Sequence, residues 1–325
     1  MRRREGKPSF RAGKVSRYAC RMSRERDFIE LLKPLARHPA ARGLTDDAAV
    51  LGLGKTAIVL THDMVVEGVH YLPGDPPEDV AWKLVAVNLS DLAAKGARPL
   101  GVLLGYALAE NEDQDAAFVA GLREALGAFS VPLLGGDTVR MPGGAPRALG
   151  LTAIGTAPPH GAPQRSGARA KDVLYMSGRV GAAGLGLAMA RGEREGPAEW
   201  LAAYRRPRPR LAEGQALAPL VHAMADISDG LLIDAQRMAE ASGLAVEIDL
   251  DAVPVEEGAD RMEAIVAGDD YELLFAGLPG LRLSQPNLAK VTPIGRFAPG
   301  RGLTLRDRNG PVPLPPRLGF EHDAP

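Results

Sequence analysis

Acidic residues recur along this chain in one local context, beside glycine, serine or threonine. Taken singly, each is typical of a helix cap or a turn, because Asp and Ser accept the first amides of a helix and Asp-Gly favours turns. Their repetition raises the alternative that several belong to one site. The segments are LTDDAAV (Asp46, Asp47), LTHDMVVEGVH (Thr61, Asp63, His70), NLSDLAAKGA (Asn88, Asp91), LLGGDTVR (Asp137, Thr138), ADISDGL (Asp226, Ser228, Asp229) and AGDDYEL (Asp269, Asp270).

Asp91 stands out because its surroundings, WKLVAVNLSDLAAKGA, predict a largely buried helix. Asn88 lies three residues before it and therefore shares its face. A buried carboxylate is costly unless it is paired or bound to a metal. Neither Lys83 nor Lys95 lies three or four positions N-terminal to Asp91 on that face. We therefore expect a bound cation, with a salt bridge across domains as the alternative.

The chemistry of the cation follows from the ligands available. If Asp46, Asp63, Asp91 and Asp137 converge, they present hard carboxylate oxygens, which favour Mg²⁺. The chain has a single cysteine, Cys20, and few histidines, so nothing argues for zinc. Several Mg²⁺ ions around a polyphosphate indicate phosphoryl transfer, where positioning and charge neutralisation carry the catalysis.

Two glycine-rich segments resemble nucleotide-binding motifs but fail the test of spacing. A P-loop ending at Gly54-Lys55-Thr56 needs its first glycine where the chain has Ala49, and the strand-like AIVL follows instead of a helix. Residues 52–56 are therefore predicted to form a hairpin turn. The segment 177–190 lacks the G-x-G-x-x-G order of a dinucleotide fingerprint, so tight packing of a helix on a strand is the better interpretation.

Composition and one segment rich in proline, glycine and arginine divide the chain of 325 residues. Residues 1–24 form a basic extension that we expect to be disordered, with a nucleic-acid-binding arm as the alternative; residues 25–157 and 165–325 are the two predicted domains, joined by the Pro/Gly/Arg-rich segment PPHGAPQRSGARA. The net charge of −1 gives no argument for nucleic acid, and no run of about 18 apolar residues predicts a membrane span. A cytoplasmic protein is expected.

Each half mixes strands with helices, which predicts an α+β or α/β protein. Periodicity indicates an opening helix over 27–38 and a long helix that begins at Glu78. The segment 131–140 is expected to be a buried strand. Residues 210–243 are expected to contain two helices interrupted by a polar turn.

The motifs, taken together and in order, resemble the thiamine-monophosphate kinase family of the aminoimidazole ribonucleotide synthetase-like superfamily. GLTDDAAVL, THDMVVEGVHY, AWKLVAVNLSDLAAKGARPLG, LLGGDTVR, QRSGARAKD, ADISDGLLIDAQRMAEASG and AGDDYELLF carry the resemblance, with the ending GFEHDAP. It covers about residues 24–323. The resemblance implies an N-terminal domain that dimerises through its sheet, and a C-terminal α/β domain over the cleft.

The resemblance also implies the reaction: ATP- and Mg²⁺-dependent phosphorylation of thiamine monophosphate (TMP) to thiamine diphosphate by direct in-line transfer, in a homodimer. Asp63, Asp91, Asp137 and Arg165 would be catalytic. The implied metal ligands are Asp46, Thr61, His62, Asp63, Asp91, Asp137, Asp226 and Asp229. Contacts to the nucleotide would come from Tyr106, Gly136, Asp137, Arg165 and Ser228, and contacts to TMP from His70, Asp269 and Phe320.

The chain departs from the family pattern at four positions: His62 replaces a threonine, Ala267 replaces a glycine, Asp269 replaces a glutamate, and Asp323 replaces the final phenylalanine. None of these changes removes a central carboxylate. Selenophosphate synthetase, another member of the superfamily, would need a reactive cysteine in a glycine-rich stretch, whereas Cys20 lies among arginines. A non-catalytic binding module is the alternative from a different class, and it would gain little from so many buried carboxylates.

Overall fold

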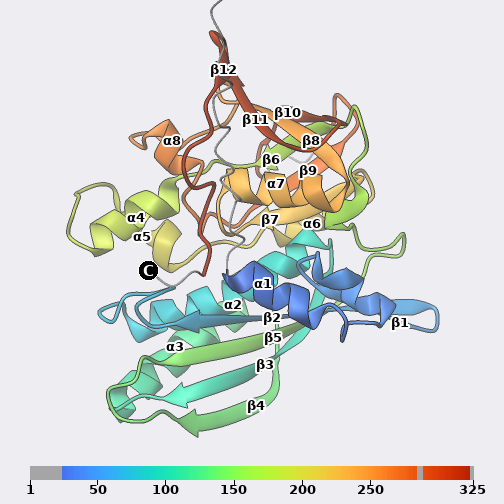
Figure 1. Cartoon of the computed structure of the whole chain (residues 1–325). Coiled ribbons are helices and arrows are strands. Elements are labelled where there is room, and N and C mark those ends of the chain that lie inside the picture. The colour runs from blue at the N-terminus through green and yellow to red at the C-terminus, as the bar shows by residue number, and fades with distance from the viewer. Residues whose placement is uncertain (1–23, 284–287, 323–325) are drawn as a thin grey trace, which may run out of the picture.

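The computed structural model describes residues 24–283 and 288–322, which form two domains, each built on one sheet (Figure 1). The sheet of the first domain has five strands in the order β1-β2-β5-β3-β4, and β3 and β4 are its parallel pair. These strands are β1 (Ala49–Leu53), β2 (Thr56–Val66), β3 (Arg98–Leu108), β4 (Leu133–Arg140) and β5 (Ala148–Thr156).

The glycine-rich turn between β1 and β2 is a hairpin turn, as the sequence predicted. The two strands pair antiparallel from Ala49 opposite Leu60 to Leu53 opposite Thr56. Gly54 has a φ of +62°, a left-handed conformation that glycine adopts without strain. No helix follows, so this segment does not cradle phosphate as a P-loop does.

Helix α2 (Pro77–Ala94) lies between the two domains and is the element that both share (Figure 1). It packs on β2 and β5 of the first sheet and on α6 and β7 of the second domain. Of its 18 residues, 14 are buried, which is expected of a helix that is covered on every side. Its polar residues therefore lie inside the molecule, as the sequence predicted for Asp91.

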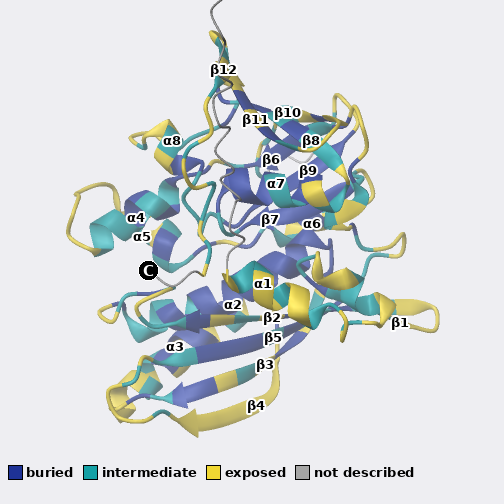
Figure 2. Ribbon diagram, in the orientation of Figure 1, coloured by how far each residue is buried: buried dark blue, intermediate teal, exposed yellow. Residues whose placement is uncertain are grey.

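The segment over 131–140 was expected to be a buried strand, and this prediction is wrong. Every residue of β4 is exposed (Figure 2), because β4 is the edge strand of its sheet. Helix α3 (Glu112–Phe129) packs against α2. It buries Phe118, Gly121, Leu122 and Ala125.

The second domain has a seven-stranded mixed sheet in the order β12-β11-β8-β10-β6-β9-β7, and β7 faces α2. Its strands are β6 (Val173–Ser177), β7 (Ala223–Ile227), β8 (Leu244–Asp249), β9 (Glu272–Gly277), β10 (Val291–Pro299), β11 (Gly302–Asp307) and β12 (Gly310–Val312). Its helices are α4 (Ala182–Ala190), α5 (Ala198–Arg205), α6 (Leu211–Leu217), α7 (Leu231–Ala241) and α8 (Arg261–Ala264), with a 3₁₀ turn, η2, at Arg165–Gly167.

The predicted pair of helices within 210–243 is only partly right. The buried strand β7 lies between α6 and α7, where the sequence indicated a polar turn. Its five residues form a short apolar run, and such a run cannot be told from a buried helix segment by periodicity. This strand places Asp226 directly under α2.

The start of the chain also differs from the expectation. Helix α1 (Arg24–Leu32) ends before Pro34, well short of the predicted end at 38, and a 3₁₀ helix, η1 (Pro39–Leu44), follows. The extension expected at residues 1–24 lies outside the described residues except for Arg24. Within the part of the chain that the structure describes, no helix is long and apolar enough to cross a membrane.

Candidate active site

Three carboxylates from three elements meet where the two domains face each other. Asp47 precedes β1, Asp91 is on α2, and Asp226 is on β7. One oxygen of each lies within 4.8 Å of an oxygen of the other two. All three side chains are almost completely inaccessible to solvent. A compact, buried group of oxygen ligands of this kind fits Mg²⁺.

The electrostatics of Asp91 and Asp226 fit a cation site. Burial raises the pKa of Asp226 to about 8, the nearby Asp47 adds to the rise, and a hydrogen bond of 2.6 Å from the Ser90 hydroxyl opposes it. Burial, and next Asp63, raise the pKa of Asp91 well above its ordinary value, although the Thr61 hydroxyl donates to this carboxylate. A metal ion at this position would stabilise both charges.

Asp63 extends the same group toward the surface. Its backbone amide donates to Asn88 Oδ1 at 2.9 Å, which attaches the end of β2 to α2. Burial raises the pKa of Asp63 to about 6; His62 opposes this rise, and Asp229 adds to it. Asp63 therefore also lacks a full countercharge.

The sequence selected Asp46 as a ligand, whereas the structure brings Asp47 into the cluster. Asp46 instead accepts from Arg42 Nη1 at 2.6 Å and from the Lys95 ammonium. Burial by itself would raise the pKa of Asp47, but Arg165 and Lys95 outweigh it and hold that pKa below the ordinary value. Two adjacent acidic residues look alike in the sequence, so only the fold decides which of them faces Asp91.

The turn before α7 adds two of the expected residues, Ser228 and Asp229. Their backbone amides donate to the buried carboxylate of Asp234, at 3.2 and 3.1 Å. Arg237 bridges Asp234, at 3.1 Å, and Asp229. Sequence analysis did not select Asp234. Its position in the first turn of α7, where an acidic side chain is favoured by the helix dipole, was the signal that could have identified it.

A cavity of about 660 Å³ opens beside the cluster, between the domains. His70 lies in its wall as a neutral imidazole, because its Nδ1 accepts from Val66 N at 3.1 Å, and burial, and next the nearby His322, lower its pKa. The ring of His322 lies 5.2 Å from that of His70 and 4.9 Å, edge-on, from that of Phe320. The expected residues that line this cavity are Asp63, His70, Ser228, Asp229, Asp269 and Phe320.

Lys83 holds the two sides of this cavity together. Its ammonium lies 2.7 Å from Asp269 Oδ2 and donates to His70 O at 2.9 Å. Tyr271 donates to the other Asp269 oxygen at 3.0 Å. Asp269 has a φ of +69°, so this anchored carboxylate sits on a left-handed backbone. Sequence analysis did not assign Lys83 to a site, because its partner is 186 residues away.

Other expected residues lie apart from this group. Gly136 and Asp137 are on β4, three strands from β2, which is about 14 Å at the usual spacing. Met64 pairs with Gly150, Gly150 with Gly105, and Gly105 with Asp137, so these four share one face. Asp63 precedes Met64 and points to the opposite face.

His62 and Tyr106 also lie outside the cavity. His62 is on the same open face as Asp137, with Nδ1 2.9 Å from Thr152 Oγ1. Tyr106 is buried against α3, where its hydroxyl donates to Asp115 at 2.6 Å and accepts from Arg147 at 2.8 Å. The roles predicted for these residues therefore stay predictions.

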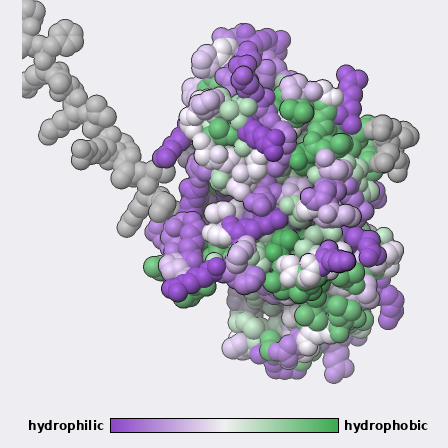
Figure 3. All heavy atoms as spheres, turned by 90° about the vertical axis from the view of Figure 1, so that its right-hand side faces the viewer, coloured by the Kyte–Doolittle hydropathy of each residue, from purple (hydrophilic) through white to green (hydrophobic). Residues whose placement is uncertain are grey.

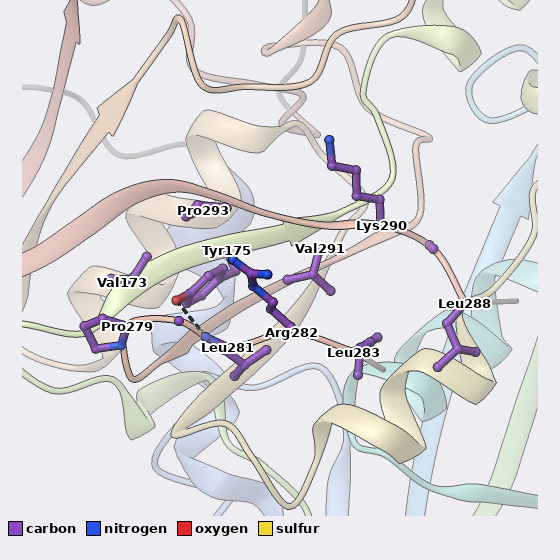
Figure 4. A pocket seen from close by; sticks show the side chains of 12 residues that line it. Val173, Tyr175, Pro279, Leu281, Arg282, Leu283, Leu288, Lys290, Val291 and Pro293 are labelled. Atoms are coloured by element: carbon purple, nitrogen blue, oxygen red, sulfur yellow. Dashed lines mark hydrogen bonds between the residues drawn. The ribbon is translucent and has the colours of Figure 1, made fainter. Parts of the chain in front are cut away.

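A second cavity, of about 690 Å³, lies beside β6 and β10 (Figure 4). Tyr175 forms one wall, and its hydroxyl accepts from Leu281 N at 3.3 Å. Arg282 and Lys290 are the charged side chains among its described lining residues, and none of these is acidic. This cavity therefore does not offer the ligands that a magnesium site needs.

The comparisons with known proteins agree with this geometry. Two family profiles match, "AIR synthase related protein, N-terminal domain" over residues 45–157 and "AIR synthase related protein, C-terminal domain" over residues 169–308. The fold and the site thus define an AIR synthase-related protein. Thiamine-monophosphate kinase from Caulobacter vibrioides is 38% identical over 314 residues, 90% of this chain and 88% of the relative. The chain belongs to the thiamine-monophosphate kinase family.

Further relatives and solved structures support the assignment. Thiamine-monophosphate kinase from Escherichia coli is 34% identical, with 80% of each chain covered. The structure of AaThiL complexed with AMPPCP and TMP has a TM-score of 0.80 and 26% identity, covering 91% of this chain and 97% of that one. Thiamine-monophosphate kinase from Stenotrophomonas maltophilia superposes with a TM-score of 0.71 at 34% identity, covering 86% of this chain and 94% of that one.

Proposed function

We infer that the protein transfers the γ-phosphoryl group of ATP to TMP and so forms thiamine diphosphate and ADP. The observation that carries this function is the buried group Asp47, Asp91 and Asp226 beside a cavity that both domains line. A phosphate oxygen of TMP attacks the γ-phosphorus, and the bond from that phosphorus to the oxygen of the β-phosphate breaks. The acceptor oxygen is already ionised near neutral pH, so no strong general base is needed.

The protein's own residues position the two anions. Arg165 is half-buried and held against Asp47, a fixed guanidinium suited to charge that develops on the transferred group. His70, Phe320 and Asp269 line the cavity that we assign to TMP. Because Lys83 and Tyr271 fix both oxygens of Asp269, this carboxylate is oriented before the substrate arrives.

We propose that magnesium is the metal and that Asp91, Asp226 and Asp63 hold it, with Asp47 beside them paired to Lys95 and Arg165. The raised pKa values of Asp91, Asp226 and Asp63 support this assignment, because a divalent cation would stabilise the ionised carboxylates. Magnesium would supply neutralisation of the phosphate charges, which suppresses the repulsion between two anionic substrates.

We further propose a homodimer in which a second copy covers the open face of the first sheet. Met64, Leu103 and Val139 on this face are 49%, 39% and 50% exposed. Apolar surface is visible on the lower part of the molecule, where the first domain lies (Figure 3). A covering copy would shield these side chains, and it would place Asp137 and His62, which the family pattern expects as metal ligands, in the interface. We place the enzyme in the cytoplasm, where ATP is available.

The test is an assay of the purified protein with ATP, Mg²⁺ and TMP, with free thiamine in place of TMP as the control. We expect thiamine diphosphate from TMP and no phosphorylated product from thiamine. Absence of thiamine diphosphate would refute the proposed reaction. Equal use of free thiamine would refute the assignment of the acceptor.

A further inference from the structure

Lys95, at the C-terminal end of α2, carries a completely buried ammonium group. It contacts Asp46 Oδ1, lies 2.6 Å from Asp47 Oδ2 and donates to the Met224 carbonyl on β7 at 3.1 Å. Two of its three N–H groups donate hydrogen bonds, to Asp46 and to the Met224 carbonyl, and its contact with Asp47 is an ion pair. The ammonium is therefore a cation with a fixed position, not a mobile surface charge.

The charges around the carboxylates are distributed unevenly. Arg42 pairs with Asp46 at 2.6 Å, and Arg165 pairs with Asp47, so protein cations surround these two residues. Asp91 and Asp226 receive only hydroxyl donors in the described structure, and no basic side chain of the described residues lies within ion-pair distance of either. The cluster thus has one side neutralised by the protein and another side without a countercharge.

The position of Lys95 excludes a second cation from the same oxygens. A divalent ion bound to both Asp46 and Asp47 would lie within a few ångströms of the ammonium, and like charges at that distance in a protein interior repel by several kcal/mol, about 4 kcal/mol per unit pair at 4 Å. Lys95 is anchored on β7 as well, so it cannot leave without giving up its bond to Met224.

We propose that the Lys95 ammonium is a permanent member of the metal cluster, which takes at Asp46 and Asp47 the position of one divalent ion. The metal ions of the reaction then bind on the side of Asp63, Asp91 and Asp226. This inference rests on the proposed function for the identity of the metal. It assigns to Lys95 a role that the family pattern of carboxylates does not contain.

The test is to count metal ions on Lys95→Met, whose side chain is similar in length and carries no charge. Mn²⁺ bound at saturation is measured by equilibrium dialysis and by electron paramagnetic resonance, without nucleotide or TMP. We expect one more Mn²⁺ per protomer than in the wild type, and an increase in melting temperature with Mn²⁺ that exceeds that of the wild type. An unchanged ion count in the folded variant would overturn the proposal.

Two double variants keep the charge balanced and locate the extra ion. Lys95→Met with Asp46→Asn leaves Asp47 as a ligand and should still gain an ion, whereas Lys95→Met with Asp47→Asn should gain none. Arg205→Met is the matched control, because Arg205 also pairs with a buried carboxylate, Asp75, that is not part of the cluster. It should leave the ion count unchanged.

Loss of folding is also informative. If Lys95→Met is unfolded without metal and folds with Mn²⁺, a divalent ion replaces the ammonium, as proposed. If neither Lys95→Met nor its Asp46→Asn double variant folds at saturating Mn²⁺, the proposal is wrong, since the ion then cannot take the position of the ammonium. Because ions are counted without turnover, either result stands apart from the kinase assay of the wild type.

Discussion

Replacement of Asp226 by asparagine should make the metal-free protein more stable at slightly alkaline pH. Asp226 is buried, accepts a hydrogen bond from Ser90 and has no ion-pair partner among the described residues. An acid whose pKa is raised on folding costs no stability below its unfolded pKa, and the cost grows as the pH rises toward the folded pKa. The loss of stability caused by ionised Asp226 therefore develops between pH 3.8 and about pH 8.

The size of the effect follows from the same pKa values. A rise from 3.8 to about 8 corresponds to at most about 5 kcal/mol at pH 8, at 1.36 kcal/mol for each pH unit. Asp226→Asn keeps the shape of the side chain and removes the charge. In the presence of EDTA we expect a gain of up to about 5 kcal/mol in the free energy of unfolding at pH 8, which declines to nothing near pH 4.

The assay is urea denaturation of the wild type and the variant, in EDTA and in excess Mg²⁺, between pH 4 and 8. Mg²⁺ should stabilise the wild type much more than the variant, because the variant lacks a ligand. Asp172→Asn is the control, since Asp172 is buried but lies 2.9 Å from His222, and it should lose stability instead. A wild type at least as stable as Asp226→Asn at pH 8 in EDTA would refute the reasoning that Asp226 lacks a countercharge.

Three further predictions concern activity and assembly. Asp91→Asn should lower kcat by more than about 100-fold while circular dichroism shows an intact fold, because it removes a proposed buried metal ligand; full activity would contradict the metal role. Phe320→Ala should raise the KM for TMP by about 2- to 13-fold with little change in kcat, because an aromatic contact contributes about 0.5–1.5 kcal/mol; an unchanged KM in steady-state kinetics would exclude the ring as a contact. Met64→Glu should convert the proposed dimer to a monomer in light scattering after size-exclusion chromatography, whereas Leu314→Glu on the second domain should not; a persistent dimer would argue for another interface.

Much of the local structure was accessible from the sequence. The spacing around Gly54 excluded a P-loop and predicted the hairpin turn, which needs only local geometry. The apolar residues around Asp91 predicted a buried helix, and α2 is buried over most of its length. The strand β7 was missed because five apolar residues carry no periodicity that separates a strand from a helix.

Pairing across the chain was not accessible. Lys95 and Asp46 are 49 residues apart, and Lys83 and Asp269 are 186 residues apart, so no rule of helical spacing relates them. The burial of β4 was predicted wrongly for a similar reason. The edge strand β4, which bears Leu133 and Val139, is as apolar as a strand in the centre of a sheet. Only the strand order distinguishes an edge strand from a central strand.

The sequence by itself determined the chemistry that is available: carboxylates beside glycine and hydroxyl residues, the hard oxygen ligands of magnesium, in an order that resembles one kinase family. Residue types and local spacing are sufficient for that. Tertiary structure decided that Asp47 rather than Asp46 faces Asp91, that Asp137 points to the other face of the sheet, and which carboxylates have protein cations beside them. These properties depend on burial and on neighbours distant in the chain, because a charge in a protein interior is governed by what surrounds it and not by its place in the sequence.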